Sequence, residues 1–317
     1  MKKHKIILTG IVLLVVVFLG VLGTAFFLGP VERETTSGKL SVVVSIEPQA
    51  YFIRQIAGDR VRVEVLVPAG KEPETYTPSP EKIRKLAKST VFFRVGFPPE
   101  DNFLPRLKSV APKLQIIDTR QGLSLRDASP HDHGHSHDHD AHSDHVDGTT
   151  CSSDGTDPHV WMSPAMVKQQ AKVILDVLVA CDPDGESAYR DGYEKFMAEL
   201  TDLQTHIREK LEPLRGKTIY VYHPSYGYFC DEFGLVQKAI EIEGKSPTPK
   251  GLADWIRTVK QDEIAAIIVQ PEFNRSATQT VAKETGVPLV SHSPLESDYH
   301  NCLLRLTEMI CTMYYEF

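Results

Sequence analysis

Apolar residues in the first half of the chain follow strand-like and helix-like patterns in turn. Residues 40–46 (LSVVVSI) form a β-branched run with the length of a buried strand, and residues 60–68 (RVRVEVLVP) alternate as a second strand does. Residues 78–90 predict a helix that Ser79 can cap. Residues 91–96 (VFFRVG) predict a third strand. This alternation is typical of a parallel α/β sheet.

The second half repeats the same alternation. Strands are predicted at residues 217–223, 264–271 and 287–292, and helices at residues 251–263 and 276–286. We therefore expect an α/β fold of two lobes, each with a mostly parallel sheet flanked by helices.

One long helix is predicted between the lobes. In residues 187–212 apolar side chains recur every three or four positions, a helical spacing sustained for about six turns. This places an N-terminal lobe at residues 40–186 and a C-terminal lobe at residues 213–317. Because a helical connector resists wide bending, we expect modest ligand-linked motion.

The N-terminus carries a candidate membrane segment. Residues 6–29 are uncharged and follow MKKHK, and this length exceeds the roughly 20 residues that cross a bilayer. We favour an uncleaved anchor within residues 1–30 and a tether at residues 31–39, with the rest of the chain on the extracytoplasmic face. A cleaved signal segment, which would leave a periplasmic or secreted protein, is the alternative.

Charge and cysteine content narrow the function classes. The net charge is −7, but residues 127–157 hold eight Asp and no Lys or Arg, so the remainder of the chain sums to +1. No basic stripe is present, which excludes nucleic-acid binding. The five Cys match no CxxC zinc or redox pattern.

A His-rich segment indicates affinity for metal ions. Residues 131–145 contain seven His and four Asp, and neutral imidazole is a ligand for zinc, copper and nickel. A stretch with almost no apolar residues cannot fold a fixed cage by itself, so we interpret it as an auxiliary metal loop within about residues 127–156. Its histidines are His131, His133, His135, His137, His139, His142 and His145.

Two further histidines lie where a strand or loop leads into a predicted helix. His159 lies in DPHVWMSP, where Ser163 and Pro164 predict a helix start. His223 ends the predicted strand TIYVYH. Ligands of α/β proteins gather at such positions. The two histidines can therefore face each other across the cleft between the lobes and hold a metal ion there.

Several segments together resemble the metal-specific solute-binding proteins of zinc and manganese ABC importers. The resemblance covers about residues 40–317 and implies two α/β lobes joined by a long helix. It also implies an ABC permease and its ATPase as partners, and a monomer that is not an enzyme. The matching segments are PAGKEPETYTPSPEKIRKLAKST, the His-rich insert, DPHVWMSP, YVYHPSYGYFCDEFGL, EGKSPTPKGLADWI and VQPEFNRSATQTVAKETGVPLV.

The resemblance also implies a ligand set, from which this chain departs at two positions. The family's ligand positions fall on Glu74, His159, His223 and Ser293, where the family usually has His at the first and often Asp at the last. Ser is a poor ligand, and the neighbouring His292 is an alternative. Glu272 is a nearby carboxylate outside the ligand set. We expect Zn²⁺, with Mn²⁺ or Fe²⁺ as the alternative because Glu74 makes the site harder.

Two other functions share this ligand set. Two His and one Glu with a water also form the site of zinc hydrolases, but the sequence contains no HExxH helix or other placed base. A metal-binding adhesin is the second competitor. A binding protein for an importer remains the favoured interpretation.

Overall fold

The computed structural model describes residues 39–127, 155–241, 248–273 and 276–315. The predicted membrane segment and tether, and all seven histidines of the His-rich segment, lie outside these residues. Among the described helices, none combines the length and the apolar character needed to cross a membrane.

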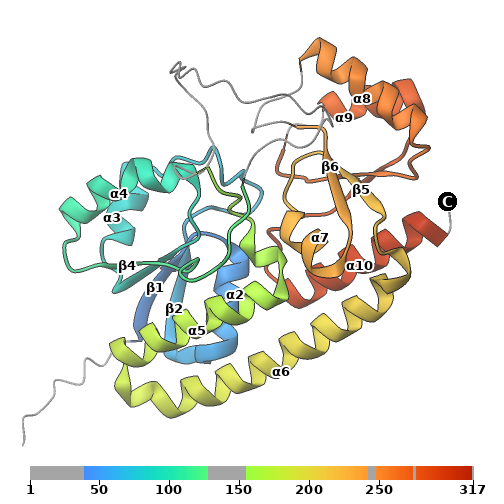
Figure 1. Ribbon diagram of the computed structural model, residues 1–317. Coiled ribbons are helices and arrows are strands. Elements are labelled where there is room, and N and C mark those ends of the chain that lie inside the picture. The colour runs from blue at the N-terminus through green and yellow to red at the C-terminus, as the bar shows by residue number, and fades with distance from the viewer. Residues whose placement is uncertain (1–38, 128–154, 242–247, 274–275, 316–317) are drawn as a thin grey trace, which may run out of the picture. The chain divides into compact units, whose positions relative to one another are not determined.

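The first sheet is parallel and has the strand order β2-β1-β3-β4. Along the chain its strands and helices alternate (Figure 1). The bounds are β1 Leu40–Val44, α2 Glu47–Ala57, β2 Val61–Val65, α3 Pro80–Leu86, β3 Val91–Arg94, α4 Pro98–Val110 and β4 Gln115–Asp118.

The second sheet repeats this order as β6-β5-β7-β8, again with parallel pairing. The chain therefore forms the two α/β lobes that the sequence predicts. The bounds are β5 Thr218–Val221, α7 Gly227–Phe233, β6 Val236–Ala239, α8 Pro249–Gln261, β7 Ile267–Val269, α9 Ser276–Thr285, β8 Leu289–Ser291 and α10 Tyr299–Tyr315.

Helices α5 (Pro164–Cys181) and α6 (Glu186–Leu211) connect the two sheets. Helix α6 runs beneath both (Figure 1), and its predicted apolar face is buried at Phe196, Leu200 and Ile207. One apolar core joins residues of both sheets with residues of α5, α6 and α10. Since this core is continuous, wide separation of the lobes would expose it to water.

Some elements were not predicted, namely α2, α4, α10, β4 and β6. Helix α4 begins with two prolines and contains Pro105, and prolines that would break a helix interior are tolerated in its first turn. Strand β6 is short, and Val236 at its start is exposed. Strand β6 therefore shows no hydrophobic period, whereas α4 buries Phe103, Leu104 and Leu107 at helical spacing behind its proline-rich start. The four described cysteines, Cys181, Cys230, Cys302 and Cys311, are free.

Candidate metal centre

Glu74 lies in the loop between β2 and α3. Turns at Pro68 and Pro73 shape this loop, because Lys71 N donates to Pro68 O over 3.2 Å and Tyr76 N donates to Pro73 O over 3.4 Å. The side chain of Glu74 is only 12% exposed. The loop thus carries a carboxylate into the protein instead of leaving it in solvent.

His159 is held by a carboxylate two residues earlier. Its backbone N donates to Asp157 Oδ1 over 2.9 Å, and its ring Nδ1 lies 2.8 Å from the same oxygen. Since a carboxylate only accepts, Nδ1 carries the hydrogen and Nε2 faces away from Asp157. Directly after His159 the chain is buried, and Ser163 caps α5 by accepting from Met166 N.

His223 follows strand β5 by two residues and is fixed at its backbone and its ring. Its backbone N donates to Gln270 Oε1 over 3.2 Å, and its carbonyl oxygen accepts from Gln270 Nε2 over 2.8 Å. Ring Nδ1 lies 2.9 Å from Glu241 Oε2, which again directs Nε2 away from the carboxylate. The ring of Phe273 stacks on the imidazole at 4.2 Å.

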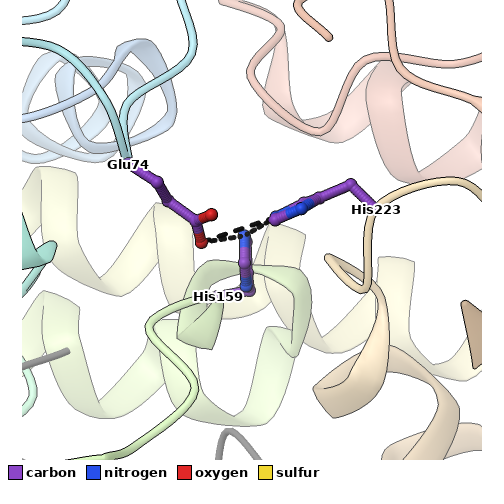
Figure 2. Close-up of side chains that lie close together, drawn as sticks. All are labelled: Glu74, His159 and His223. Carbon is purple, nitrogen blue, oxygen red and sulfur yellow. Dashed lines mark hydrogen bonds and ion pairs between the residues drawn. The ribbon is translucent and has the colours of Figure 1, made fainter. Parts of the chain in front are cut away.

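These three side chains, Glu74, His159 and His223, form one compact group that we call the metal cluster. Figure 2 shows the carboxylate and both rings directed toward one another. The two Nε2 atoms are 3.2 Å apart, and Glu74 Oε1 lies 3.6 Å from Nε2 of His159 and 3.4 Å from Nε2 of His223. Among the described residues, this is the one group of His, Cys, Asp or Glu that could hold a metal ion.

Electrostatic coupling within the metal cluster is strong. Burial disfavours the charged form of Glu74, but the adjacent His223 and His159 lower the pKa of its carboxyl to about 2. Burial likewise opposes protonation of His223, yet Glu74 and Glu241 raise the pKa of its imidazole to about 10. Without a metal ion, a proton on His223 is therefore the cation that Glu74 and Glu241 stabilise.

The cavity at the metal cluster has the size of a single ion or water. Its volume is about 10 Å³. The walls are mainly apolar and come from both lobes: Pro73, Phe97, Trp161, Ser225, Phe273, Pro294 and Leu295 surround the three cluster residues.

Ser293, predicted at the fourth position, is not part of the metal cluster. Its hydroxyl donates to Glu272 Oε1 and accepts from Leu295 N over 3.1 Å. Ser293 and Glu272 instead line a separate cavity of about 410 Å³.

The alternative His292 also lies outside the metal cluster. Its Nδ1 is 3.0 Å from Tyr226 Oη, and its Nε2 is 3.0 Å from the carbonyl oxygen of Cys302. Burial lowers the pKa of His292 to about 4. This histidine is neutral, and both of its nitrogens are engaged away from Glu74.

Sequence reasoning missed the residues that orient the two histidines. Asp157 and the pair Gln270 and Phe273 stand within quoted motifs, DPH and QPEF, so a signal existed. Glu241 follows β6, which is the neighbour of β5 in the sheet. It is 18 positions from His223, and only the strand order brings the two together.

Comparisons with known proteins agree with this fold. Zinc-binding lipoprotein AdcA of Streptococcus pneumoniae is 27% identical over 270 residues, which cover 84% of this chain and 52% of AdcA. The chain thus spans about half the length of that relative. Manganese-binding lipoprotein MntA of Halalkalibacterium halodurans is 27% identical over 254 residues, covering 79% of this chain and 77% of MntA.

A solved structure gives a longer match. The crystal structure of a ZnuA protein superposes with a TM-score of 0.76 at 30% identity, and the match covers 87% of this chain and 99% of that one. The family model described as ZnuA, zinc-uptake complex component A periplasmic, matches residues 42–310. Since that match includes both lobes, the chain belongs to the family of the periplasmic component A of zinc-uptake complexes.

Proposed function

We propose that this protein is an extracytoplasmic solute-binding protein that captures a divalent transition metal ion, zinc foremost, and delivers it to an ABC importer. The observation that carries the proposal is the metal cluster. Two buried imidazoles and one carboxylate, supplied by separate parts of the fold, bring their ligand atoms within 4.8 Å of one another. Each ring is oriented by a carboxylate at Nδ1, so that Nε2 is the metal-facing atom.

The spacing of the three ligand atoms suits zinc. Two ligand atoms bound to a tetrahedral zinc ion at the usual bond lengths lie about 3.3–3.4 Å apart. The three separations here are 3.2, 3.4 and 3.6 Å. The three atoms therefore approximate one face of such a tetrahedron, and they need only small adjustments to bind the ion.

Manganese or iron(II) is the alternative cargo. The carboxylate of Glu74 is a harder ligand than imidazole and is compatible with these metals. The relative MntA is described as manganese-binding. Two nitrogen ligands against one oxygen nonetheless favour zinc.

The small cavity supports binding over catalysis. Substrate pockets occupy about 300–1,000 Å³, whereas the cavity at the metal cluster measures about 10 Å³. A hydrolase would need space for a substrate beside the metal-bound water. We therefore propose that the protein is not an enzyme and that the ion itself is the cargo.

The remaining parts of the chain fit a receptor of this kind. We propose that residues 1–30 attach the protein to the membrane, with residues 31–39 as the tether, and that the His-rich segment is an auxiliary metal loop. Residues 40–186 and 213–317 would be the two lobes on either side of the linking helix, and the permease with its ATPase would receive the ion. We propose that the receptor acts as a monomer.

Metal analysis of purified residues 31–317 tests the proposal. We expect one tightly bound zinc ion at the metal cluster and weaker competition by manganese in a titration against a chelator of known affinity. A protein without a tight site for zinc, manganese or iron(II) would overturn the proposed function.

A further inference from the structure

Arg126 joins the segment that follows β4 to helix α7 of the other lobe. Its Nη1 donates to the carbonyl oxygen of Gly227 over 2.8 Å and lies 2.6 Å from Asp231 Oδ2. Its guanidinium also lies over the ring of Tyr228, 5.9 Å from the centroid. One arginine thus contacts three residues of α7.

The backbone of Arg126 continues this connection to Asp157. Arg126 N donates to Tyr228 Oη over 2.9 Å, and Tyr228 Oη donates to Asp157 O over 2.8 Å. Asp157 N in turn donates to Arg126 O over 2.8 Å. Three hydrogen bonds therefore close a ring through Arg126, Tyr228 and Asp157.

Asp157 is also the residue that orients His159. Its Oδ1 accepts hydrogen bonds from the backbone N and the ring Nδ1 of His159. Its Oδ2 lies 3.8 Å from Arg126 Nε. The backbone of Asp157 is thus fixed by Arg126 and by Tyr228 of the C-terminal lobe. Its carboxylate lies between Arg126 and the ring of His159.

We propose that Arg126 and Tyr228 are positioning residues that couple the docking of the two lobes to the orientation of His159, through Asp157. This inference rests on the proposed function, because it concerns the affinity of the same site. The interlobe contact limits rotation of the Asp157 carboxylate, so the imidazole of His159 is ordered before the ion arrives. An ordered ligand loses less entropy on binding. By linkage, the bound ion strengthens the contact between the lobes to the same degree.

The chain contains a matched control of the same composition. Arg60 Nη2 lies 2.9 Å from Asp182 Oδ2, its guanidinium lies 5.8 Å from the centroid of the Tyr189 ring, and Tyr189 Oη donates to Asp182. Asp182 follows the C-terminal end of α5, whereas His159 precedes its start. The helix separates the two groups by about 27 Å.

Zinc affinity of Arg126→Met and Tyr228→Phe, beside Arg60→Met, tests the proposal. We expect Arg126→Met to weaken zinc binding about 10–100-fold, as removal of partners beyond the ligands typically does. Tyr228→Phe, which removes one hydroxyl, should weaken it severalfold. Arg60→Met should lower the melting temperature and leave the zinc affinity unchanged. If Arg126→Met does not fold, Tyr228→Phe alone decides the result.

A double-mutant cycle identifies the route of the effect. If Arg126 acts through Asp157, the loss in Arg126→Met/Asp157→Asn should be smaller than the sum of the two single losses. NMR chemical shifts of the ring nitrogens of His159 report which nitrogen carries the hydrogen. They should show loss of the Nδ1–H tautomer in Asp157→Asn and a mixture of the two tautomers in Arg126→Met. Arg126→Lys should restore part of the affinity.

Two outcomes overturn the coupling. One is wild-type zinc affinity in both Arg126→Met and Tyr228→Phe, and the other is full additivity in the cycle. Failure of the proposed function is distinguishable, because wild-type protein would then lack a tight zinc site, or His159→Ala would retain it.

Discussion

The two lobes have the same strand order, but they differ in the side chains at the carboxyl ends of their two central strands. In an open α/β sheet, ligands bind where neighbouring strands connect in opposite directions, at the carboxyl ends of the strands. That point lies between β1 and β3 in one lobe and between β5 and β7 in the other. In the C-terminal lobe, His223 follows β5 and Gln270 follows β7, so a side chain of the metal cluster lies there.

The corresponding position in the N-terminal sheet, at the carboxyl ends of β1 and β3, is occupied by a buried carboxylate. Glu100, only 2% exposed, accepts from Gly96 N over 2.8 Å and from Arg94 Nε over 2.9 Å. It also accepts from the hydroxyl of Ser45, which follows β1. Burial raises the pKa of Glu100, while the charge of Arg94 counteracts the rise. The groups at this point satisfy one another and leave no ligand for an ion.

The strand order thus creates an equivalent position in each sheet. The side chains at that position determine whether it can bind a ligand. With its own position closed, the N-terminal half supplies Glu74 from the loop after β2 and His159 from the segment before α5. His223 is held by Gln270 and Glu241, which follow strands of its own sheet. His159 is held by Asp157, two residues earlier in the chain. Substitutions at each place should therefore differ in their effect on zinc binding.

Removal of either histidine should have the largest effect. His159→Ala or His223→Ala should weaken zinc binding by more than about 100-fold, since even partners beyond the ligands typically contribute about 10–100-fold. A chelator competition assay measures this loss. His206→Ala, on the exposed face of α6, is the control and should bind as the wild type does. Full affinity in either cluster variant would contradict the assignment of its histidine.

Changes at Glu74 should have the next largest effect and should alter selectivity. Glu74→Gln keeps the shape but removes the charge, so zinc affinity should fall by about tenfold or more. Glu74→His replaces oxygen with nitrogen and should raise the preference for zinc over manganese. Competitive titration with both metals measures the ratio. An unchanged ratio in Glu74→His would exclude Glu74 from the ligand set.

For a change of one pH unit, the effect on zinc affinity should be no larger, and it should extend above the ordinary pKa range of histidine. Because the pKa of His223 is raised to about 10 in the metal-free cluster, zinc must displace its proton at neutral pH. Affinity should rise by up to about tenfold per pH unit from pH 6 to pH 8.5. Glu74, with its pKa lowered to about 2, stays ionised throughout. Calorimetry in buffers of different ionisation enthalpy counts the released protons, and release of none at pH 8 would contradict the coupling.

The same shifts predict the stability of the metal-free protein. A raised pKa of His223 stabilises the fold fully below about pH 6.5, its value in unfolded chains, and this contribution is lost as the pH rises through 10. The lowered pKa of Glu74 contributes above about pH 4.5 and is lost as the pH falls through 2. Thermal unfolding without metal should show both losses. His223→Ala should remove the first and reduce the second, because His159 also lowers the pKa of Glu74.

Substitution of Glu100, in the N-terminal sheet, should have the smallest effect on metal binding. Glu100→Gln should reduce the free energy of unfolding by about 1–3 kcal/mol, because it weakens buried hydrogen bonds to a charged group. Zinc affinity should change by less than about threefold, since Glu100 contacts Ser45, Gly96 and Arg94. Denaturant unfolding and zinc titration of one sample measure both. A large loss of affinity with little loss of stability would contradict the comparison.

The sequence predicted the features that depend on local pattern. Alternating strands and helices led to the α/β fold, the apolar spacing of residues 187–212 led to α6, and Ser79 and Ser163 cap helices as expected. The structure brings Glu74, His159 and His223 together, which the resemblance and the two helix mouths predicted. Their role as ligands stays a prediction.

Features that depend on three-dimensional arrangement were not predictable. Glu241 reaches His223 only because β6 and β5 are neighbours in the sheet. Ser293 faces Glu272 because the segment after β8 turns it toward the larger cavity. The proline-rich start of α4 concealed a helix whose Glu100 closes the N-terminal sheet.

The segment between Asp127 and Thr156 enters and leaves the fold at one place. These two residues form an antiparallel bridge, and the α-carbons of such a pair lie only about 4.5–5.5 Å apart. Exposed sites with adjacent ends tolerate inserted domains. A fluorescent protein could therefore replace the intervening residues without redirecting the chain. Since Asp157 comes next and contacts His159, that junction is a rational starting point for a genetically encoded zinc sensor.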